Sequence, residues 1–456
     1  MEGGAGLFLN ILFLFVMFPV SLFLYHSFPH RFRSTILLLT SIALLIFWQR
    51  ENCLLFFALI LFTNLCGRYL ATLPSSASRT KMLLLFHDGI YLAALFFLRP
   101  PHVWSLFGNP LYLTGISILT LQSLSYVHQI AQRRLQPEKV GGRFALYMCF
   151  FPKLLFGPYV SYSAFQRLHR RLRCSAEQIG KGLHKMICGL AKVVLLSGQL
   201  SLIFQQMQAA TTERNTVFFT WMYYGIYFLS FYFQIAGYTD MATGFAACYG
   251  YTLPESNRLP LWNRRFSVFL CNWNRTVCKW FLCAFGVSLR KKSFRWLRLI
   301  LACSLFGWFC RGRMTALLWG LLTGSFLLLS TWMHRKWRFP HVLDWCMVIL
   351  VGILGWSLFC ADTLTEAVSA WGFLFGKSRD LVCYQDLYFL QSSIWLLLIA
   401  LFCTTGWHQG IKRWLLQRKQ TAWLATVFMS VGNVLLLCLS IVAMVSDAAP
   451  PLFLQW

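Results

Sequence analysis

Long apolar runs separated by short polar and basic stretches form the dominant pattern of this chain. Runs of about 20 residues, the length that crosses the hydrocarbon core of a bilayer, recur along the whole sequence. They fall at residues 7–25, 54–73, 83–98, 217–233, 316–332 and 424–445. The pattern predicts an all-α integral membrane protein: a polytopic helical bundle with about 10 to 12 spans, some of them re-entrant.

Composition agrees with this interpretation. Of the 456 residues, 58% are hydrophobic and 12% are charged, whereas soluble domains have about 25% charged residues. No basic segment precedes the run at residues 7–25 and no cleavage motif follows it, so we interpret it as the first span. No long linker or low-complexity stretch divides the chain. We therefore expect a single membrane domain over residues 1–456.

The positive charge predicts topology. Forty-one Lys and Arg residues against 14 Asp and Glu give a net charge of +27, which in a soluble chain would indicate nucleic-acid binding. Here the basic clusters at residues 31–33, 68–81 and 133–143 fall in alternate loops, as the positive-inside rule requires. We expect a multi-pass protein of the cell (inner) membrane with its N-terminus outside. The expected partner is the lipid bilayer, with no nucleic acid.

Cysteine and histidine provide no metal-binding pattern. Most of the 16 cysteines lie inside apolar runs, where cysteine behaves as a small apolar side chain. No Cys-x-x-Cys pair accompanies a histidine cluster, so we expect no metal and no bound cofactor. His128 and His184 lie at the ends of apolar segments, and we interpret them as interfacial residues rather than catalysts.

Five motifs occur between residues 113 and 359. Residues 150–158 read FFPKLLFGP, residues 232–244 read YFQIAGYTDMATG and residues 250–256 read GYTLPES. LTGIS and LQSLSY lie within residues 113–126, and GWSLF occupies residues 355–359. In sequence and in order, these blocks resemble motifs of the membrane-bound O-acyltransferase family, in the branch of alginate O-acetylation and D-alanyl transfer proteins.

The resemblance implies a helical bundle around a central tunnel, in which an acyl thioester meets an acceptor hydroxyl. The implied function is transfer of an acyl group, acetyl in the first instance, to a hydroxyl of an envelope polysaccharide or related polymer. Acetyl-CoA or an acyl carrier would be the donor. The implied partners are an extracytoplasmic acyl-transfer protein or an acyl carrier protein. Such a reaction normally uses a general base with a pKa near neutrality, for which histidine is suited.

The catalytic positions depart from the family pattern. Residues 307–324 align with GLWHGAGWTFVLWGLLHG, but its two histidines are replaced by Cys310 and Thr323. Residues 269–283 resemble FWRRWHISLSSWLRD, with Asn274 in place of the histidine and with Cys271 and Asn272 in place of the paired arginines. The retained residues are Gly307, Thr315, Trp319, Gly320 and Gly324. No histidine lies between residues 184 and 334, so a shift of register does not restore the base.

Cys310 and Asn274 are the catalytic candidates that the resemblance implies, and three interpretations of Cys310 remain open. It is an inert core cysteine, or catalysis persists through positioning of the two substrates alone. In the third interpretation, Cys310 is a nucleophile that carries the acyl group, and Arg311 and Arg313 lower the pKa of its thiol.

Asp240, Lys153 and Thr323 are candidates for the wall of the substrate funnel. A carboxylate at membrane depth is costly and marks a functional site, although Asp240 could instead anchor a neighbouring helix through an arginine. Lys153 could contact an anionic donor or extend its ammonium group toward the interface.

Two further functions stay open. The chain could be a catalytically degenerate scaffold that binds lipid or an acyl donor. It could also be a transporter, as Asp240 and the proline-interrupted segments near residues 152 and 158 would allow.

Overall fold

The computed structural model describes most of the chain. The described residues are 9–49, 52–75, 77–98, 104–106, 109–111, 115–154, 157–172, 174–210, 216–256, 272, 274–287, 294–336, 341–377, 380–405 and 419–445. Helices dominate these residues, as predicted, and one two-stranded antiparallel sheet accompanies them. The fold is that of an all-α polytopic membrane protein.

The described residues form two compact units that alternate along the sequence. The first contains residues up to 186 together with residues 238–254, and the second contains residues 187–237 and those from 255 onward. Two long helical segments, residues 176–210 and residues 217–248, contribute to both units. The expectation of a single membrane domain stays a prediction.

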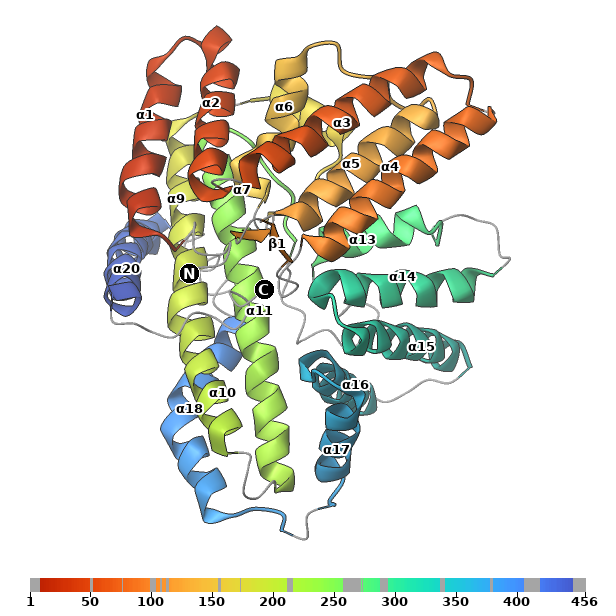
Figure 1. Ribbon diagram of the computed structural model, residues 1–456. Helices are drawn as coiled ribbons and strands as arrows, with labels where there is room; N and C mark the ends of the chain where they lie inside the picture. The colour runs from red at the N-terminus through yellow and green to blue at the C-terminus, as the bar shows by residue number, and fades with distance from the viewer. Residues whose placement is uncertain are drawn as a thin grey trace. The chain divides into compact units, whose positions relative to one another are not determined.

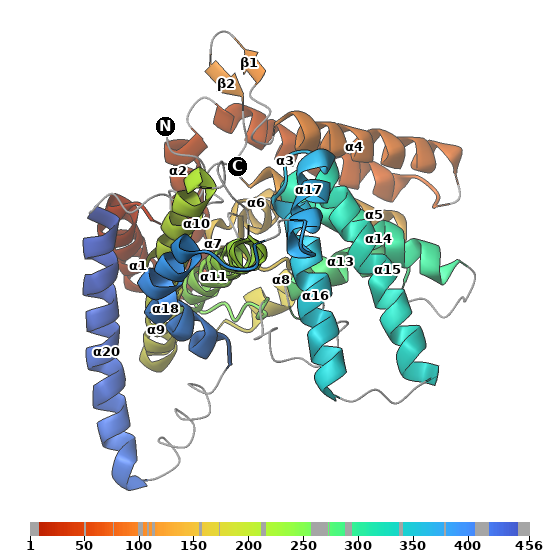
Figure 2. The ribbon, with the colours of Figure 1, turned by 90° about the horizontal axis from the view of Figure 1, so that it is seen from below.

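The first unit begins with a π-helical segment and continues through nine helices and a hairpin. Its elements are η2 (Phe13–Met17), α1 (Phe18–Ser27), α2 (His30–Gln49), α3 (Cys53–Thr72), α4 (Ser78–Phe97), β1 (Trp104–Leu106), β2 (Asn109–Leu111), α5 (Ile116–Ala131), α6 (Gly141–Cys149), α7 (Phe151–Leu154), α8 (Tyr162–Arg170) and the first part of α9 (Ala176–Ala191). Strands β1 and β2 pair with Ser105 opposite Pro110, and the hairpin projects from its neighbours (Figure 2). Helices α3, α4 and α5 lie side by side (Figure 1).

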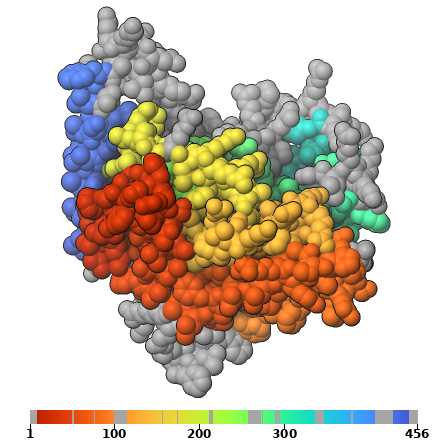
Figure 3. Space-filling model, turned by 90° about the horizontal axis from the view of Figure 1, so that it is seen from above, coloured from red at the N-terminus to blue at the C-terminus, as the bar shows by residue number. Residues whose placement is uncertain are grey.

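Aromatic side chains fill part of the core of this unit. The ring of Phe245 contacts the rings of Phe13 and Phe18 at centroid distances of 5.4 and 4.8 Å, and Phe151 packs against Phe13 at 5.9 Å. Figure 3 shows elements from the N-terminal helices to α9 side by side on one face. The FFPKLLFGP motif and Phe245, the residue directly after the YFQIAGYTDMATG motif, therefore meet the first helices of the chain in one apolar core.

The second unit consists of further helices and one π-helical segment. They are η4 (Lys192–Gly198), α10 (Gln199–Ala210), the first part of α11 (Val217–Cys248), α13 (Arg275–Ala284), α14 (Arg295–Arg311), α15 (Met314–Lys336), α16 (His341–Cys360), α17 (Leu364–Leu374), α18 (Tyr384–Thr405) and α20 (Lys419–Val445). Helices α13, α14 and α15 follow one another in a layer, and α16 packs between α15 and α17 (Figure 1).

Seven helical segments among the described residues are long and apolar enough to cross a bilayer. They are His30–Gln49, Cys53–Thr72, Ser78–Phe97, Ala176–Ala210, Met314–His334, Tyr384–Thr405 and Val427–Val445. Two shorter apolar helices, Phe13–Ser27 and Cys346–Cys360, accompany them. This number is smaller than the 10 to 12 spans expected from the sequence. Only 6% of the apolar window in the last segment is buried, which is typical of a helix that faces lipid.

Candidate functional site

Helices α13 and α14 of the second unit place Asn274 and Cys310, two of the three substituted histidine positions. The ring of Phe281 on α13 packs on the rings of Phe306 and Phe309 of α14, with centroid distances of 5.7 and 5.4 Å. At the far end of the pair, Nη1 of Arg298 donates to the carbonyl oxygen of Gly286 at 3.3 Å. The start of α14 therefore meets the end of α13, and the two helices are antiparallel.

This antiparallel packing brings Asn274 and Cys310 to the same end of the helix pair. Asn274 immediately precedes α13, whereas Cys310 lies in the last turn of α14. Figure 1 shows the end of α14 beside the start of α13. The family positions thus share one region of the second unit although 35 residues separate them in sequence.

The retained glycines hold α14 against α15. A Cβ atom on Gly320 would lie 2.5 Å from Cα of Ser304 and 2.7 Å from the carbonyl carbon of Cys303. A Cβ atom on Gly307 would collide with the carbonyl oxygen of Ala316, and one on Gly324 would also meet α14. Small residues four apart allow close contact between membrane helices. These family residues serve helix packing.

Trp319 connects this pair to the GWSLF motif. Its ring packs on those of Trp356 and Phe359 at centroid distances of 6.0 and 5.2 Å. A Cβ atom on Gly355 would lie 3.1 Å from the indole of Trp319, a spacing tighter than most contacts of this kind. Gly355 of the GWSLF motif, which has no side chain, therefore leaves space for the indole of Trp319.

Cys310 is partly buried and is followed by two cations that share one carboxylate. Nη2 of Arg311 donates to Oδ1 of Asp362 at 3.2 Å, and Arg313 forms an ion pair with the same oxygen. Nη1 of Arg311 also donates to the Tyr227 hydroxyl at 3.4 Å. Asp362 offsets one of the two positive charges, so one net positive charge remains next to Cys310. The nucleophile interpretation of Cys310 stays a prediction.

Asn274 has a left-handed backbone, with φ at 47° and ψ at 50°, a conformation that asparagine tolerates better than most residues. Its Oδ1 accepts a hydrogen bond from the Ser256 hydroxyl at 3.3 Å, and the carbonyl of Ser256 accepts the N–H of Arg275 at 2.7 Å. Ser256 ends the GYTLPES motif and positions the start of α13. The sequence did not predict that Ser256 positions the start of α13, although Ser256 is the last residue of the GYTLPES motif.

Thr323 is buried and its hydroxyl donates to the carbonyl of Gly320, one turn earlier in α15, at 3.0 Å. The hydroxyl thus has a partner within its own helix. Its role in a substrate funnel stays a prediction. Asn272 is partly buried, and Cys271 lies outside the described residues.

Lys153, in the first unit, does not extend toward an interface, and that expectation is wrong. Its side chain is fully buried, with Nζ 3.5 Å from the ring centroid of Tyr147 and 4.7 Å from that of Phe165. Burial holds the pKa of Lys153 well below its usual range, because the charged form loses its hydration. Contact with an anionic donor stays a prediction.

Asp240, also in the first unit, connects α11 to α9. Its Oδ1 lies 3.8 Å from Nζ of Lys185, so the cation is a lysine and not the arginine that we expected. A Cβ atom on Gly244 would lie 2.7 Å from the carbonyl oxygen of Gly182, which shows how closely the two helices approach. Asp240 anchors a neighbouring helix, and its role in substrate binding stays a prediction.

The helices and motifs define a polytopic α-helical membrane protein with an acyltransferase framework, and comparisons with known proteins agree. No family model matches the chain. The probable alginate O-acetylase AlgI of Pseudomonas putida is 23% identical over 385 residues, covering 80% of this chain and 79% of the relative.

Two other relatives match shorter parts. The peptidoglycan O-acetyltransferase of Helicobacter pylori is 24% identical over 307 residues, covering 59% of this chain and 58% of the relative. The teichoic acid D-alanyltransferase of Bacillus subtilis is 24% identical over 218 residues, covering 46% of this chain and 53% of the relative. These relatives are members of the membrane-bound O-acyltransferase family, and the chain is similar to them over as much as 80% of its length. By family resemblance it is an O-acyltransferase.

Proposed function

We propose that the protein transfers an acyl group, acetyl in the first instance, from a thioester to a hydroxyl of an envelope polysaccharide or related polymer. The arrangement of Asn274 and Cys310 at one end of the α13–α14 pair is the observation that supports this most. Acetyl-CoA or an acyl carrier supplies the group. The protein lies in the inner membrane with its N-terminus outside, and an extracytoplasmic partner or an acyl carrier protein acts with it.

The reaction needs few groups from the protein. The acceptor oxygen attacks the thioester carbonyl, the carbon–sulfur bond breaks, and the hydroxyl proton ends on the released thiol. Holding the two substrates in contact can lower the barrier by about 7 to 11 kcal/mol without a base. A missing general base costs about 10²- to 10⁴-fold in rate. We therefore expect slow transfer that depends on substrate positioning.

Full-length protein in liposomes, supplied with [14C]acetyl-CoA and alginate oligosaccharides, tests this function. The assay measures labelled ester and released thiol together, so hydrolysis and transfer are counted separately. The wild type is expected to form ester slowly. Cys310→His and Asn274→His should each be tried alone and together, because histidine is also tolerated in the left-handed conformation of residue 274. The double variant is expected to be faster by about 10²-fold or more.

Cysteine variants separate positioning from covalent catalysis. With positioning alone, Cys310→Ala and Cys310→Ser retain similar transfer rates. Loss of activity in Cys310→Ala but not in Cys310→Ser would favour a nucleophile at this position. The matched control is Gly352→Ala, because a Cβ atom at Gly352 meets nothing within 4 Å. Folded wild type that forms no ester with acetyl-CoA or an acyl carrier as donor would contradict the proposal.

A catalytically degenerate scaffold is the second candidate, and specific contacts favour it. The Asn274 side chain bonds Ser256, and Asp362 binds both arginines beside Cys310, so these groups contribute to the fold. A scaffold would bind acetyl-CoA or lipid, detected as a shift in the unfolding midpoint, while releasing no thiol. Ester formation by the wild type excludes it.

A further inference from the structure

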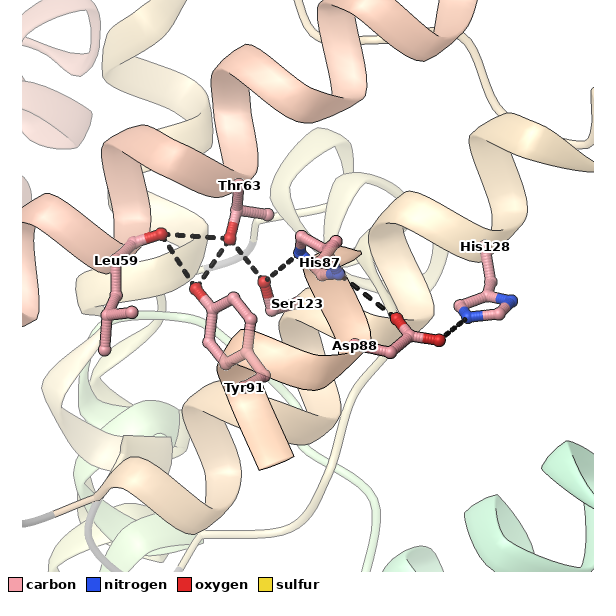
Figure 4. Close-up of polar contacts among 7 residues, drawn as sticks. All are labelled: Leu59, Thr63, His87, Asp88, Tyr91, Ser123 and His128. Carbon is pink, nitrogen blue, oxygen red and sulfur yellow. Dashed lines mark hydrogen bonds and ion pairs between the residues drawn. The ribbon is translucent and has the colours of Figure 1, made fainter. Parts of the chain in front are cut away.

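A chain of polar side chains crosses the layer formed by α3, α4 and α5 in the first unit (Figure 4). It joins two histidines, one aspartate and three hydroxyl groups: His87, Asp88 and Tyr91 on α4, Thr63 on α3, and Ser123 and His128 on α5. His87 and Asp88 lie halfway along α4, which is one of the candidate membrane spans. The resemblance to acyltransferases assigns no role to these residues.

Asp88 bridges the two imidazoles. Its Oδ1 lies 3.2 Å from Nδ1 of His87, and its Oδ2 lies 2.7 Å from Nε2 of His128. An ionised carboxylate only accepts hydrogen bonds, so it accepts from whichever facing ring nitrogen carries a hydrogen. The side chain of His128 is 42% exposed, that of Asp88 is 25% exposed and that of His87 is fully buried. The bridge therefore leads from the surface of the unit to its interior.

Hydroxyl groups continue the chain beyond His87. Nε2 of His87 lies 3.3 Å from the Ser123 hydroxyl, which contacts the hydroxyl of Thr63. The hydroxyls of Thr63 and Tyr91 are 2.6 Å apart, and Tyr91 donates to the carbonyl of Leu59 at 2.8 Å. A hydroxyl can donate one hydrogen bond while accepting others. The direction of donation along this part can therefore reverse when His87 changes protonation.

The chain follows the helix axes inward from the basic end of the layer. Nη1 of Arg133, just after α5, donates to the carbonyl of Ala71 near the end of α3 at 2.8 Å, so these two helix ends lie together. His128 is one turn from the end of α5, whereas Leu59 lies 13 residues before the last residue of α3. At a rise of about 1.5 Å per residue, the chain extends roughly 15 Å along the helices, which is half of a hydrocarbon core of about 30 Å.

Helix association alone does not require these residue types. Ser, Thr and Tyr hydroxyls suffice to join membrane helices, and such contacts contribute modestly to stability. A carboxylate with two imidazoles at membrane depth is much more costly, and connected Asp and His residues at such depth are typical of proton relays. The partly exposed His128 lies near the basic end of the layer, where the chain of polar groups begins.

We propose that His128, Asp88, His87 and the hydroxyls of Ser123, Thr63 and Tyr91 form a proton relay between the basic end of this layer and its interior. A proton passes from Nε2 of the His128 imidazolium to Oδ2 of Asp88, the protonated carboxyl group turns about its Cβ–Cγ bond, and the same proton passes to Nδ1 of a neutral His87 that carries its own hydrogen on Nε2. His128 becomes neutral, Asp88 is again a carboxylate and His87 becomes the imidazolium, so protons and charge balance. Nε2–H of His87 then donates to Ser123. The relay is independent of the proposed acyl transfer.

Hydrogen–deuterium exchange at the buried imidazole tests the relay. Full-length protein labelled with ¹⁵N in its histidine rings is transferred to D₂O in nanodiscs, and NMR follows the ring N–H signals of His87. In the wild type these signals are expected to exchange rapidly through His128. In His128→Phe, exchange should slow by at least about tenfold. The substitution is at the exposed end of the chain, so the buried contacts of His87 remain. His30→Phe, at an exposed histidine of the same unit, is the matched control and should exchange as the wild type does.

Equal exchange in the wild type and in His128→Phe would overturn the relay and leave these contacts as helix-joining hydrogen bonds. Slow exchange in both the wild type and His128→Phe would also overturn the relay. Asp88→Asn gives a second test, because an amide cannot pass the proton and should slow exchange as strongly as His128→Phe. Unfolding curves recorded for each protein ensure that the comparison is made between folded samples, and His128→Phe decides the outcome if Asp88→Asn fails to fold.

Discussion

The close contact between α14 and α15 makes Gly320→Ala a strong perturbation of the second unit. The new Cβ atom would lie 2.5 Å from Cα of Ser304 and 2.7 Å from the carbonyl carbon of Cys303. Both neighbours are backbone atoms, so the helices must separate by at least about 0.5 Å, and a gap of that size removes about a quarter of the dispersion energy across a contact. Overpacking of this kind costs about 1 to 3 kcal/mol, while alanine in a helix regains about 0.5 to 1 kcal/mol.

The expected result is a net loss of about 1 to 2 kcal/mol in the free energy of unfolding, measured by denaturant titration of the protein in micelles. Gly352→Ala in α16 is the matched control, because its Cβ atom meets nothing within 4 Å. That variant should be as stable as the wild type or up to about 1 kcal/mol more stable. Wild-type stability in Gly320→Ala would refute the packing role of the retained glycines.

Three other changes test local features. Asn274→Ala should lower the free energy of unfolding by about 1 to 2 kcal/mol, because alanine is strained in the left-handed conformation. Asn274→Gly should lower it less, and equal losses in the two variants would contradict the argument from backbone strain. Burial and the charge of Arg143 hold the pKa of His169 below its ordinary value of 6.5, so the unfolded chain binds this proton at higher pH than the folded protein. The free energy of unfolding should therefore fall as the pH drops below about 6.5, and His169→Gln should reduce that dependence. The same pH profile in the variant and the wild type would rule out this role of His169. Asp386 is buried and accepts a hydrogen bond from Thr216 at 2.6 Å. Asp386→Ala should therefore lower the free energy of unfolding by about 1 to 3 kcal/mol. An unchanged free energy of unfolding would show that the contact does not contribute to stability.

The apolar runs predicted most of the long helices but not how they pack. Helix α3 covers residues 53–72 against an expected run of 54–73, and α20 covers residues 419–445 against 424–445. Helix α11 continues to residue 248, well beyond the run that ends at residue 233. Hydropathy does not distinguish a face that contacts lipid from one that contacts another helix, because both surroundings are apolar. The partners of each helix therefore required the structure.

The candidate site was only partly predictable. The alignment identified Asn274 and Cys310, and the structure places both at one end of a helix pair. The family motif could not show that Asp362, about 50 residues after Cys310, pairs with both neighbouring arginines, since that contact depends on how α14 and α16 pack. Of the two alternatives for Lys153, extension to the interface is wrong because the side chain is buried, and contact with an anionic donor stays a prediction. The signal for the polar chain in Figure 4 was a His-Asp pair in the middle of an apolar run, at His87.

Ester formation by the wild-type protein tests the central claim most directly. Full-length protein in liposomes receives [14C]acetyl-CoA and alginate oligosaccharides, and labelled ester is measured against released thiol. The proposed function predicts slow ester formation without any histidine at residues 274 and 310, with a gain of about 10²-fold or more when both become histidine. Wild type that binds acetyl-CoA but forms no ester, beside a double variant that does, would contradict the claim and identify the chain as a degenerate scaffold.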